Sequence, residues 1–144
     1  MALVFDKDIL ARTIYGEARG EYFSRVGGLS ALIAVGNVVL NRMKRKKWFG
    51  TTVREVCLKP FQFSCWNEKD PNFRVVKSVS RQDPIFEICY HVAEQLCDGR
   101  WPDLTQNADH YYAVSMKIPP AWAKDKKPTI QIGGHVFFNL EASI

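Results

Sequence analysis

The chain has 144 residues, of which 47% are hydrophobic and 24% charged, with a formal net charge of +5 at pH 7. This balance is typical of a globular protein and excludes an intrinsically disordered chain. The length suits one hydrophobic core, so we expect residues 1–144 to form a single domain. The excess of positive charge favours an anionic partner, such as nucleic acid or a bacterial cell envelope, without choosing between them.

The chain contains no segment typical of a membrane span or of a secretory signal. The longest apolar run, 29–40, is short and interrupted by Ser30, Gly36 and Asn37. The N-terminal residues lack a positive start and a small-residue cleavage site. We therefore expect synthesis in a cytoplasm, no integral membrane segment, and four free cysteine thiols. No CxxC pair is present, so we expect no metal site.

Capping residues and apolar periodicity predict four helices. They cover residues 6–19, 24–44, 52–58 and 83–97. The first would begin at Asp6 or Asp8 and close at Gly20, and Ser24 would cap the second. Residues 59–73 are rich in aromatic side chains and show no clean period, so we expect a structured loop there.

The last of these helices has the clearest start, because Asp83 can cap it and Pro84 suits its first turn. Beyond it, the aromatic runs 108–115 and 133–139 are β-prone and predict a small hairpin near the C-terminus. The proline- and lysine-rich segment 118–128 would loop between them. The sequence therefore predicts a mainly helical (α+β) fold.

Glu17 occupies a position where the first helix calls for an apolar residue. Leu10 and Ile14 share one face, Glu17 continues it three residues on, and Glu21 follows after four more. A buried carboxylate is costly unless it is hydrogen-bonded, paired or protonated. A carboxyl group kept partly protonated is what general-acid cleavage of a glycosidic bond requires. Glu17 is therefore the candidate acid, with Glu21 as a secondary candidate.

A structural role is the alternative for both carboxylates. Glu17 could pair with Arg12, Arg19 or Arg25, although Arg19 lies two residues away and points to another face. Glu21 lies where the first helix is expected to end, so it could be a cap or an ion pair facing the turn into the second helix.

Several blocks of sequence occur in an order that is typical of one family. They are ARTIYGEARGE (11–21), VGNVVLNRM (35–43), FQFSCWN (61–67), DHYYAV (109–114) and GGHVFF (133–138). Together they resemble the SleB-type cell-wall hydrolases, which include the spore-cortex-lytic enzymes. The resemblance implies a fold similar to lysozyme and lytic transglycosylase domains, with the acid at the end of an early helix. The family's catalytic glutamate corresponds to the first glutamate of GEARGE, which is Glu17.

The resemblance also implies that the block QFSCW lines a glycan cleft. Gln62 and Ser64 would hydrogen-bond to sugar hydroxyl or acetamido groups, with Phe63 between them. The alternative is that Phe61, Phe63 and Trp66 are core aromatics, and we expect at least one of them to be.

Two adjacent tyrosines are further candidates for substrate binding. Tyr111 and Tyr112 alternate on a strand, so one should face the cleft and the other the core. The approach to them, 103–110, departs from the pattern of the cortex-lytic relatives. A spore-cortex substrate is therefore not assumed.

The resemblance implies peptidoglycan as the substrate, cut at the β-1,4 bond between N-acetylmuramic acid and N-acetylglucosamine without a cofactor. No acidic residue besides Glu21 stands in a matching motif, so we expect a lytic transglycosylase that leaves 1,6-anhydro-muramyl ends. Hydrolysis of the muramidase type is the alternative. A basic chain without a wall-binding domain or signal is the layout of many bacteriophage endolysins. We expect a monomer that acts in the periplasm after release, although a bacterial enzyme with a missing signal segment would look the same.

Two other classes of function remain as alternatives. A zinc amidase would need His91, His110, His135 and a cysteine as ligands, but their spacing fits no short motif and we interpret His110 and His135 as structural. A non-catalytic nucleic-acid or glycan-binding module could use the basic cluster 42–47, but it leaves Glu17 unexplained. We interpret that cluster as a solvated helix end and expect no nucleic-acid partner.

Overall fold

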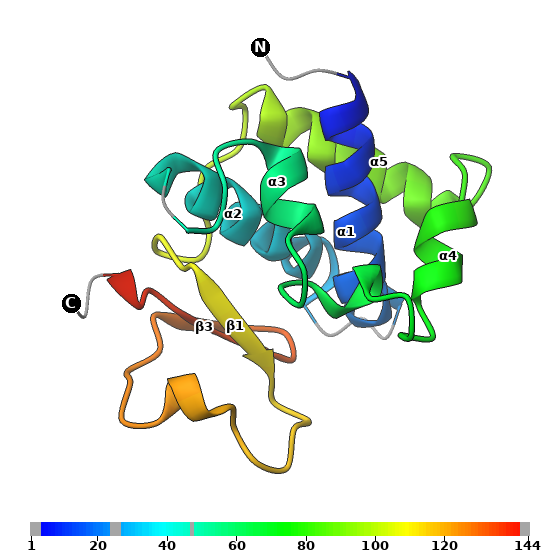
Figure 1. Ribbon diagram of the computed structural model, residues 1–144. Coiled ribbons are helices and arrows are strands. Elements are labelled where there is room, and N and C mark those ends of the chain that lie inside the picture. Colours follow the sequence, from blue (N-terminus) through cyan, green and yellow to red (C-terminus); the bar gives the residue numbers. More distant parts are fainter. Residues whose placement is uncertain (1–3, 24–26, 47, 142–144) are drawn as a thin grey trace.

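The computed structural model describes residues 4–23, 27–46 and 48–141. In chain order its elements are α1 (Val4–Phe23), α2 (Gly28–Arg45), α3 (Val53–Leu58), the 3₁₀ turn η1 (Ser64–Trp66), α4 (Phe73–Ser78), α5 (Pro84–Cys97), β1 (His110–Ala113), the 3₁₀ turn η2 (Ala121–Ala123), β2 (Ile130–Ile132) and β3 (His135–Phe138). Figure 1 shows the helices as one layer, with the strands and the segment between β1 and β2 below them.

The prediction of a mainly helical fold with a minor β element near the C-terminus is confirmed. The sheet has one strand more than the expected hairpin, because residues 130–132 pair with β3. The result is a three-stranded antiparallel sheet in the order β1-β3-β2. β1 therefore forms an edge of the sheet, and this edge becomes one wall of the site described below.

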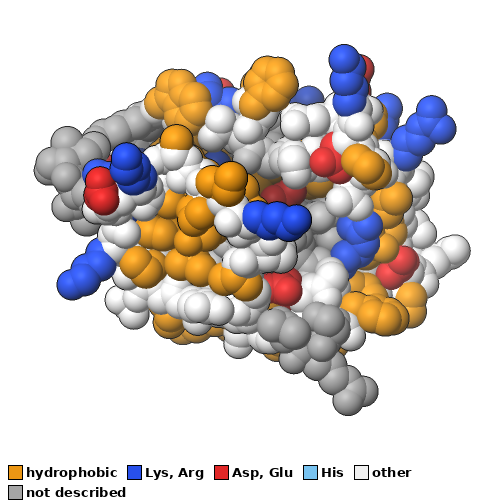
Figure 2. Space-filling view, turned by 90° about the horizontal axis from the view of Figure 1, so that it is seen from below, with side chains coloured by type: hydrophobic (Ala, Val, Ile, Leu, Met, Phe, Trp, Pro, Cys, Tyr) orange, Lys and Arg blue, Asp and Glu red, His pale blue; other side chains and the backbone are white. Residues whose placement is uncertain are grey.

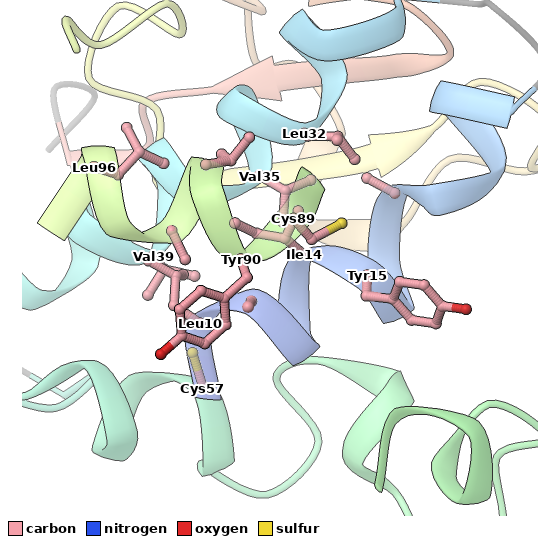
Figure 3. Packing of buried hydrophobic residues seen from close by; sticks show 14 of the residues in the cluster. Leu10, Ile14, Tyr15, Leu32, Val35, Val39, Cys57, Cys89, Tyr90 and Leu96 are labelled. Carbon is pink, nitrogen blue, oxygen red and sulfur yellow. The ribbon is translucent and has the colours of Figure 1, made fainter. Parts of the chain in front are cut away.

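Helix α1 is the centre of the helical layer and packs against α2, α3, α4 and α5. Leu10 and Ile14 are fully buried, as the apolar stripe predicts. Figure 3 shows them among side chains of α2, such as Val35, and of α5, such as Leu96. Each fully buried side chain of this size contributes roughly 1.5–3 kcal/mol to stability, which fixes the direction of α1 and the place of Glu17.

The predicted end of the first helix at Gly20 is wrong. α1 continues to Phe23, and Gly20 does not adopt the positive φ that closes a helix. A glycine inside a helix is tolerated at a cost of about 0.5–1 kcal/mol. The consequence is that Glu21 stays on the helix. The predicted cap at Ser24 lies outside the described residues.

The start of α5 is confirmed as predicted. The Oδ1 atom of Asp83 accepts hydrogen bonds from the backbone N–H groups of Ile85 (2.9 Å) and Phe86 (3.1 Å), and Pro84 is the first helical residue. α3 is capped by Thr52, also as predicted. In contrast, α4 was not predicted, because it is six residues long and has no side-chain cap.

The two faces of the sheet have different neighbours. Tyr111 and Phe137 are paired across β1 and β3, and this face packs on α2 through Ala34 and Val38. On the opposite face, Trp122 of η2 packs against His110, Tyr112 and Phe138 at ring distances of 4.8–6.0 Å. The sheet thus stands between α2 and the segment that carries η2.

The interpretation of the basic cluster 42–47 as a solvated helix end is wrong for its two arginines. Arg42 is only 5% exposed, and its guanidinium lies over the rings of Phe49 (4.7 Å) and Phe63 (5.0 Å). Burial lowers the pKa of Arg42 below its usual value. Arg45 pairs with Asp109 and, at 2.9 Å, with Glu141. Both arginines therefore join α2 to other parts of the core instead of offering charge to a ligand.

Asp109 links the end of α2 to the last described residues. Its carboxylate pairs with Arg45 and accepts hydrogen bonds from the backbone N–H groups of Leu140 (2.9 Å) and Glu141 (3.2 Å). Burial by itself raises its pKa, but the hydrogen bonds from His110, Leu140 and Glu141 outweigh burial and lower the pKa to about 2. The ionised carboxylate therefore stabilises the fold.

Asp109→Asn is expected to lower the free energy of unfolding at pH 7 by about 2 kcal/mol. Because the pKa of Asp109 is lowered on folding, its contribution is complete above about pH 4. It is lost as the pH falls toward 2, so the variant and the wild type should converge there. Urea unfolding at pH 7 and at low pH measures this, with the exposed Asp125→Asn as a control. An equal difference at both pH values would contradict the role of the charge.

Candidate functional site

Glu17 lies near the end of α1, half-buried, where three segments meet. Its Oε1 atom accepts a hydrogen bond of 2.7 Å from the hydroxyl of Tyr111 on β1. Its Oε2 atom accepts one of 3.3 Å from the backbone N–H of Cys65 in η1. Glu17, the carboxylate that interrupts the apolar stripe, therefore has a hydrogen-bond donor at each of its two oxygens.

An ion pair does not explain Glu17 within the described part of the chain. Arg12 pairs with Asp8 at 2.8 Å. Arg19 donates to the carbonyl of Tyr15 and to Asn72. Arg25, the third partner considered, lies outside the described residues. Two of the three arginines considered as ion-pair partners of Glu17 are therefore bonded to other groups.

Glu17 lines two cavities. The larger, which we call the main groove, has a volume of about 440 Å³ and is lined by residues that include Glu17, Ser64, Asn72, Tyr111, Tyr112 and Trp122. The smaller, which we call the side cavity, has a volume of about 340 Å³ and is lined by residues that include Glu17, Glu21, Ser115 and Gly134. Both share Glu17, Ala113 and His135, so Glu17 stands at their junction.

The predicted tyrosines both line the main groove, although one was expected to face the core. Tyr111 packs on the core and reaches Glu17 with its hydroxyl. Tyr112 lies on the opposite face of β1, stacked on Phe138. Both reach the groove because β1 is an edge strand. Burial, and then the negative charge of Glu17, raise the pKa of Tyr111 well above its ordinary value, so its hydroxyl remains a donor.

Some residues of the block QFSCW line the main groove, and others pack in the core. Ser64 lines the main groove, whereas Gln62 does not. Phe63 is 1% exposed and lies under the guanidinium of Arg42, so it offers no surface to a ligand, contrary to the expectation. Trp66 also packs on the core and donates to the hydroxyl of Thr13. Phe61 is exposed and lines neither cavity.

Glu21 lines the side cavity. The turn into the second helix, which we expected it to face, includes residues 24–26 and so lies outside the described residues. The Oε1 atom of Glu21 accepts a hydrogen bond of 2.5 Å from the backbone N–H of Gly134 and lies 3.8 Å from Nδ1 of His135. The same carboxylate therefore holds the turn between β2 and β3 and faces the cavity that Glu17 also lines.

His135, Asn72 and Trp122 line the main groove but were not predicted to do so. Asn72 and Trp122 come from loops whose sequences carry no period. For His135 a signal existed, since it follows the pair Gly133 and Gly134. A side chain at position 134 would meet Oε1 of Glu21 at 2.8 Å, so the glycine marks a close approach of the chain to a carboxylate.

The described parts of the chain hold neither a group of metal-ligating side chains nor a helix that could span a membrane. No three of the described His, Cys, Asp and Glu side chains are grouped as a metal site would require. His91 instead lies on the exposed face of α5 beside Glu87 and Glu94. Cys57 is buried, which raises its pKa to about 12. None of the described helices has the length and apolar character needed to cross a bilayer.

Two solved structures have a similar fold. The catalytic domain of the Bacillus cereus SleB protein is 23% identical with a TM-score of 0.66, over 92% of this chain and 88% of that one. The catalytic domain of the germination-specific lytic transglycosylase SleB from Bacillus anthracis is 24% identical with a TM-score of 0.64, over 96% of each chain. At this level of identity the likeness shows the fold alone.

A sequence comparison gives the family. No curated protein sequence matches the chain significantly. Residues 28–138 match the sequence profile of a family described as Cell Wall Hydrolase. The matched segment begins at α2, so it includes β1 and β3 but leaves Glu17 outside. Because it spans well over half of the sequence, the chain belongs to the cell wall hydrolase family.

Proposed function

We propose that the protein cleaves the glycan strands of peptidoglycan at the β-1,4 bond between N-acetylmuramic acid and N-acetylglucosamine. Glu17 is the general acid. The observation that carries this proposal is a carboxylate with two donors at the junction of two cavities. Membership of the cell wall hydrolase family supports the substrate class.

The main groove has the composition that a sugar chain needs. Aromatic faces of Tyr112 and Trp122 can stack on pyranose rings, and Ser64 and Asn72 can hydrogen-bond to their substituents. Glu17 protonates the bridging oxygen while positive charge develops on the muramyl ring. Tyr111 and the N–H of Cys65 hold the carboxyl group in one orientation during this transfer.

The favoured outcome is that of a lytic transglycosylase. After cleavage Glu17 is a carboxylate and takes the proton from the C6 hydroxyl of the muramyl ring. That oxygen then bonds to C1 and leaves a 1,6-anhydro end. A relative of similar fold is named as a lytic transglycosylase, which favours this outcome. Hydrolysis is the second candidate, and the position of Glu21 in the side cavity favours it.

Mass spectrometry of muropeptides released from purified sacculi tests the proposal. Anhydro ends are lighter than reducing ends by one water, so the two products are resolved in a single digest. We expect anhydro ends to predominate. Release of peptides without any cut in the glycan would contradict the proposed bond, and a digest with reducing ends alone would replace the transglycosylase by a muramidase.

We also propose that the protein acts as a bacteriolytic endolysin, as a monomer, on the cell wall after release from the cytoplasm. The net charge of +5 favours encounter with an anionic envelope. Figure 2 shows Lys and Arg side chains scattered over the face below the sheet rather than gathered in one patch. Purified protein should clear Gram-negative cells whose outer membrane has been permeabilised, whereas a Glu17→Gln variant should not.

A further inference from the structure

His135 is a buried histidine whose ring is incompletely satisfied. It is 7% exposed, and its Nδ1 atom has no hydrogen-bond partner among the described residues. Its ring packs on Tyr111 at 4.9 Å, the residue that donates to Glu17. A buried polar atom without a partner is costly, so a ring in this state beside the acid needs an explanation.

Glu21 supplies the group that this ring faces. Its Oε1 atom lies 3.8 Å from Nδ1 of His135, slightly beyond a hydrogen bond. The backbone N–H of Gly134 fixes the same oxygen at 2.5 Å. A carboxylate beside Nδ1 favours the tautomer with its proton on Nδ1, which leaves the lone pair on Nε2. The carboxylate and the imidazole thus face each other within ion-pair distance.

The pair lies where a small molecule can reach the reaction centre. Glu17, Glu21 and His135 line the side cavity together, and Glu17 and His135 also line the main groove. The volume of the side cavity, about 340 Å³, is well above the roughly 30 Å³ that one water molecule occupies in the liquid. With a glycan strand in the main groove, water can stand in the side cavity next to His135.

The protonation state of His135 suits the uptake of a proton. Burial lowers its pKa below the ordinary value, and the charges of Glu21 and Glu17 oppose this only in part. The imidazole is therefore neutral near pH 7 and has a free lone pair.

We propose that Glu21 and His135 form a second acid–base site, which activates water and gives the enzyme a hydrolytic branch beside the anhydro-forming one. This inference rests on the proposed function of Glu17. His135 is the residue that contacts the reacting water, and Glu21 is a positioning residue that acts through His135.

The hydrolytic step balances with one water. Glu17 has given its proton to the leaving N-acetylglucosamine oxygen, and the C1–O bond is broken. The oxygen of water then bonds to C1 of the muramyl ring while one of its protons passes to Nε2 of His135. The imidazolium returns that proton, by way of solvent, to Glu17. The net change is one glycosidic bond lost and one water consumed.

The ratio of reducing to anhydro muramyl ends tests the proposal, because it does not depend on how much of a variant is folded. We expect wild-type digests to contain both kinds of end. His135→Gln should lower the ratio by at least about tenfold, since a positioned base contributes rate factors of this size or more. Glu21→Gln, whose amide oxygen can still accept from Gly134, should lower it in the same direction. His91→Gln, on the exposed face of α5, is the matched control and should leave it unchanged.

Three outcomes overturn the inference. Wild-type digests with anhydro ends alone would remove the hydrolytic branch while leaving the proposed function intact. A ratio unchanged in His135→Gln would remove His135 as the base. A wild-type enzyme that cuts no glycan at all would remove the proposed function and, with it, this site.

Discussion

Replacing Glu17 by glutamine is expected to lower the rate of glycan cleavage by about a thousandfold, in the range typical of a lost general acid. Glutamine has nearly the same shape but no acidic proton to give to the bridging oxygen. Both product branches begin with this transfer, so anhydro and reducing ends should fall together. The measurement is the initial rate of muropeptide release from purified sacculi, with the amounts of folded protein matched.

The same substitution should leave the fold intact. The amide oxygen of glutamine can accept from the N–H of Cys65, and its NH₂ group can donate to the oxygen of Tyr111, since a hydroxyl both donates and accepts. We expect the free energy of unfolding to change by less than about 1 kcal/mol. Urea unfolding followed by circular dichroism checks this.

Glu68→Gln is the matched control for this experiment, because Glu68 is exposed and lines neither cavity. It should keep wild-type activity. A folded, active Glu17→Gln variant would contradict the proposed mechanism. Loss of activity in both variants would show that the assay responds to charge rather than to the acid.

The features that sequence predicted well are local ones. The cap at Asp83 and the proline after it lie within one turn, so α5 could be placed to the residue. The position of Glu17 follows from Leu10 and Ile14 on the same helix face, and both are fully buried. Hydrophobic periodicity and helix caps depend on residues only a few positions apart in the sequence, and tertiary packing did not override these local preferences.

The features that sequence missed depend on contacts between distant segments. Arg42 reads as part of a basic run, and only the rings of Phe49 and Phe63 reveal it as a core residue. Glu21 and His135 are 114 positions apart in the numbering, and a turn held by Gly134 brings them together. Neither hydrophobic periodicity nor a helix cap indicates contacts between residues so far apart in the sequence. The pairing of Glu21 with His135 could therefore be found only from the structure.

Gly16, next to Glu17, shows how closely the site depends on one contact between helix and loop. A Cβ atom at this position would lie 2.6 Å from Cβ of Cys65 and 2.7 Å from Cγ1 of Val76. Both distances are below any normal contact, so η1 or α4 would have to move. The N–H of Cys65 is a donor to Glu17, which means that such a movement also disturbs the acid.

Gly16→Ala is therefore expected to reduce stability by about 1–3 kcal/mol, as overpacking does. It should also reduce kcat/KM by about tenfold or more, because small displacements of a catalytic group are costly. Gly20→Ala, one turn further along α1, is the matched control. A Cβ there meets nothing within 4 Å, so alanine should stabilise the helix by about 0.5–1 kcal/mol. Changes of opposite sign in the free energy of unfolding, measured with urea, would separate the effect of packing from that of helix propensity. A Gly16→Ala variant as stable as Gly20→Ala would mean that α1 and η1 are not in contact.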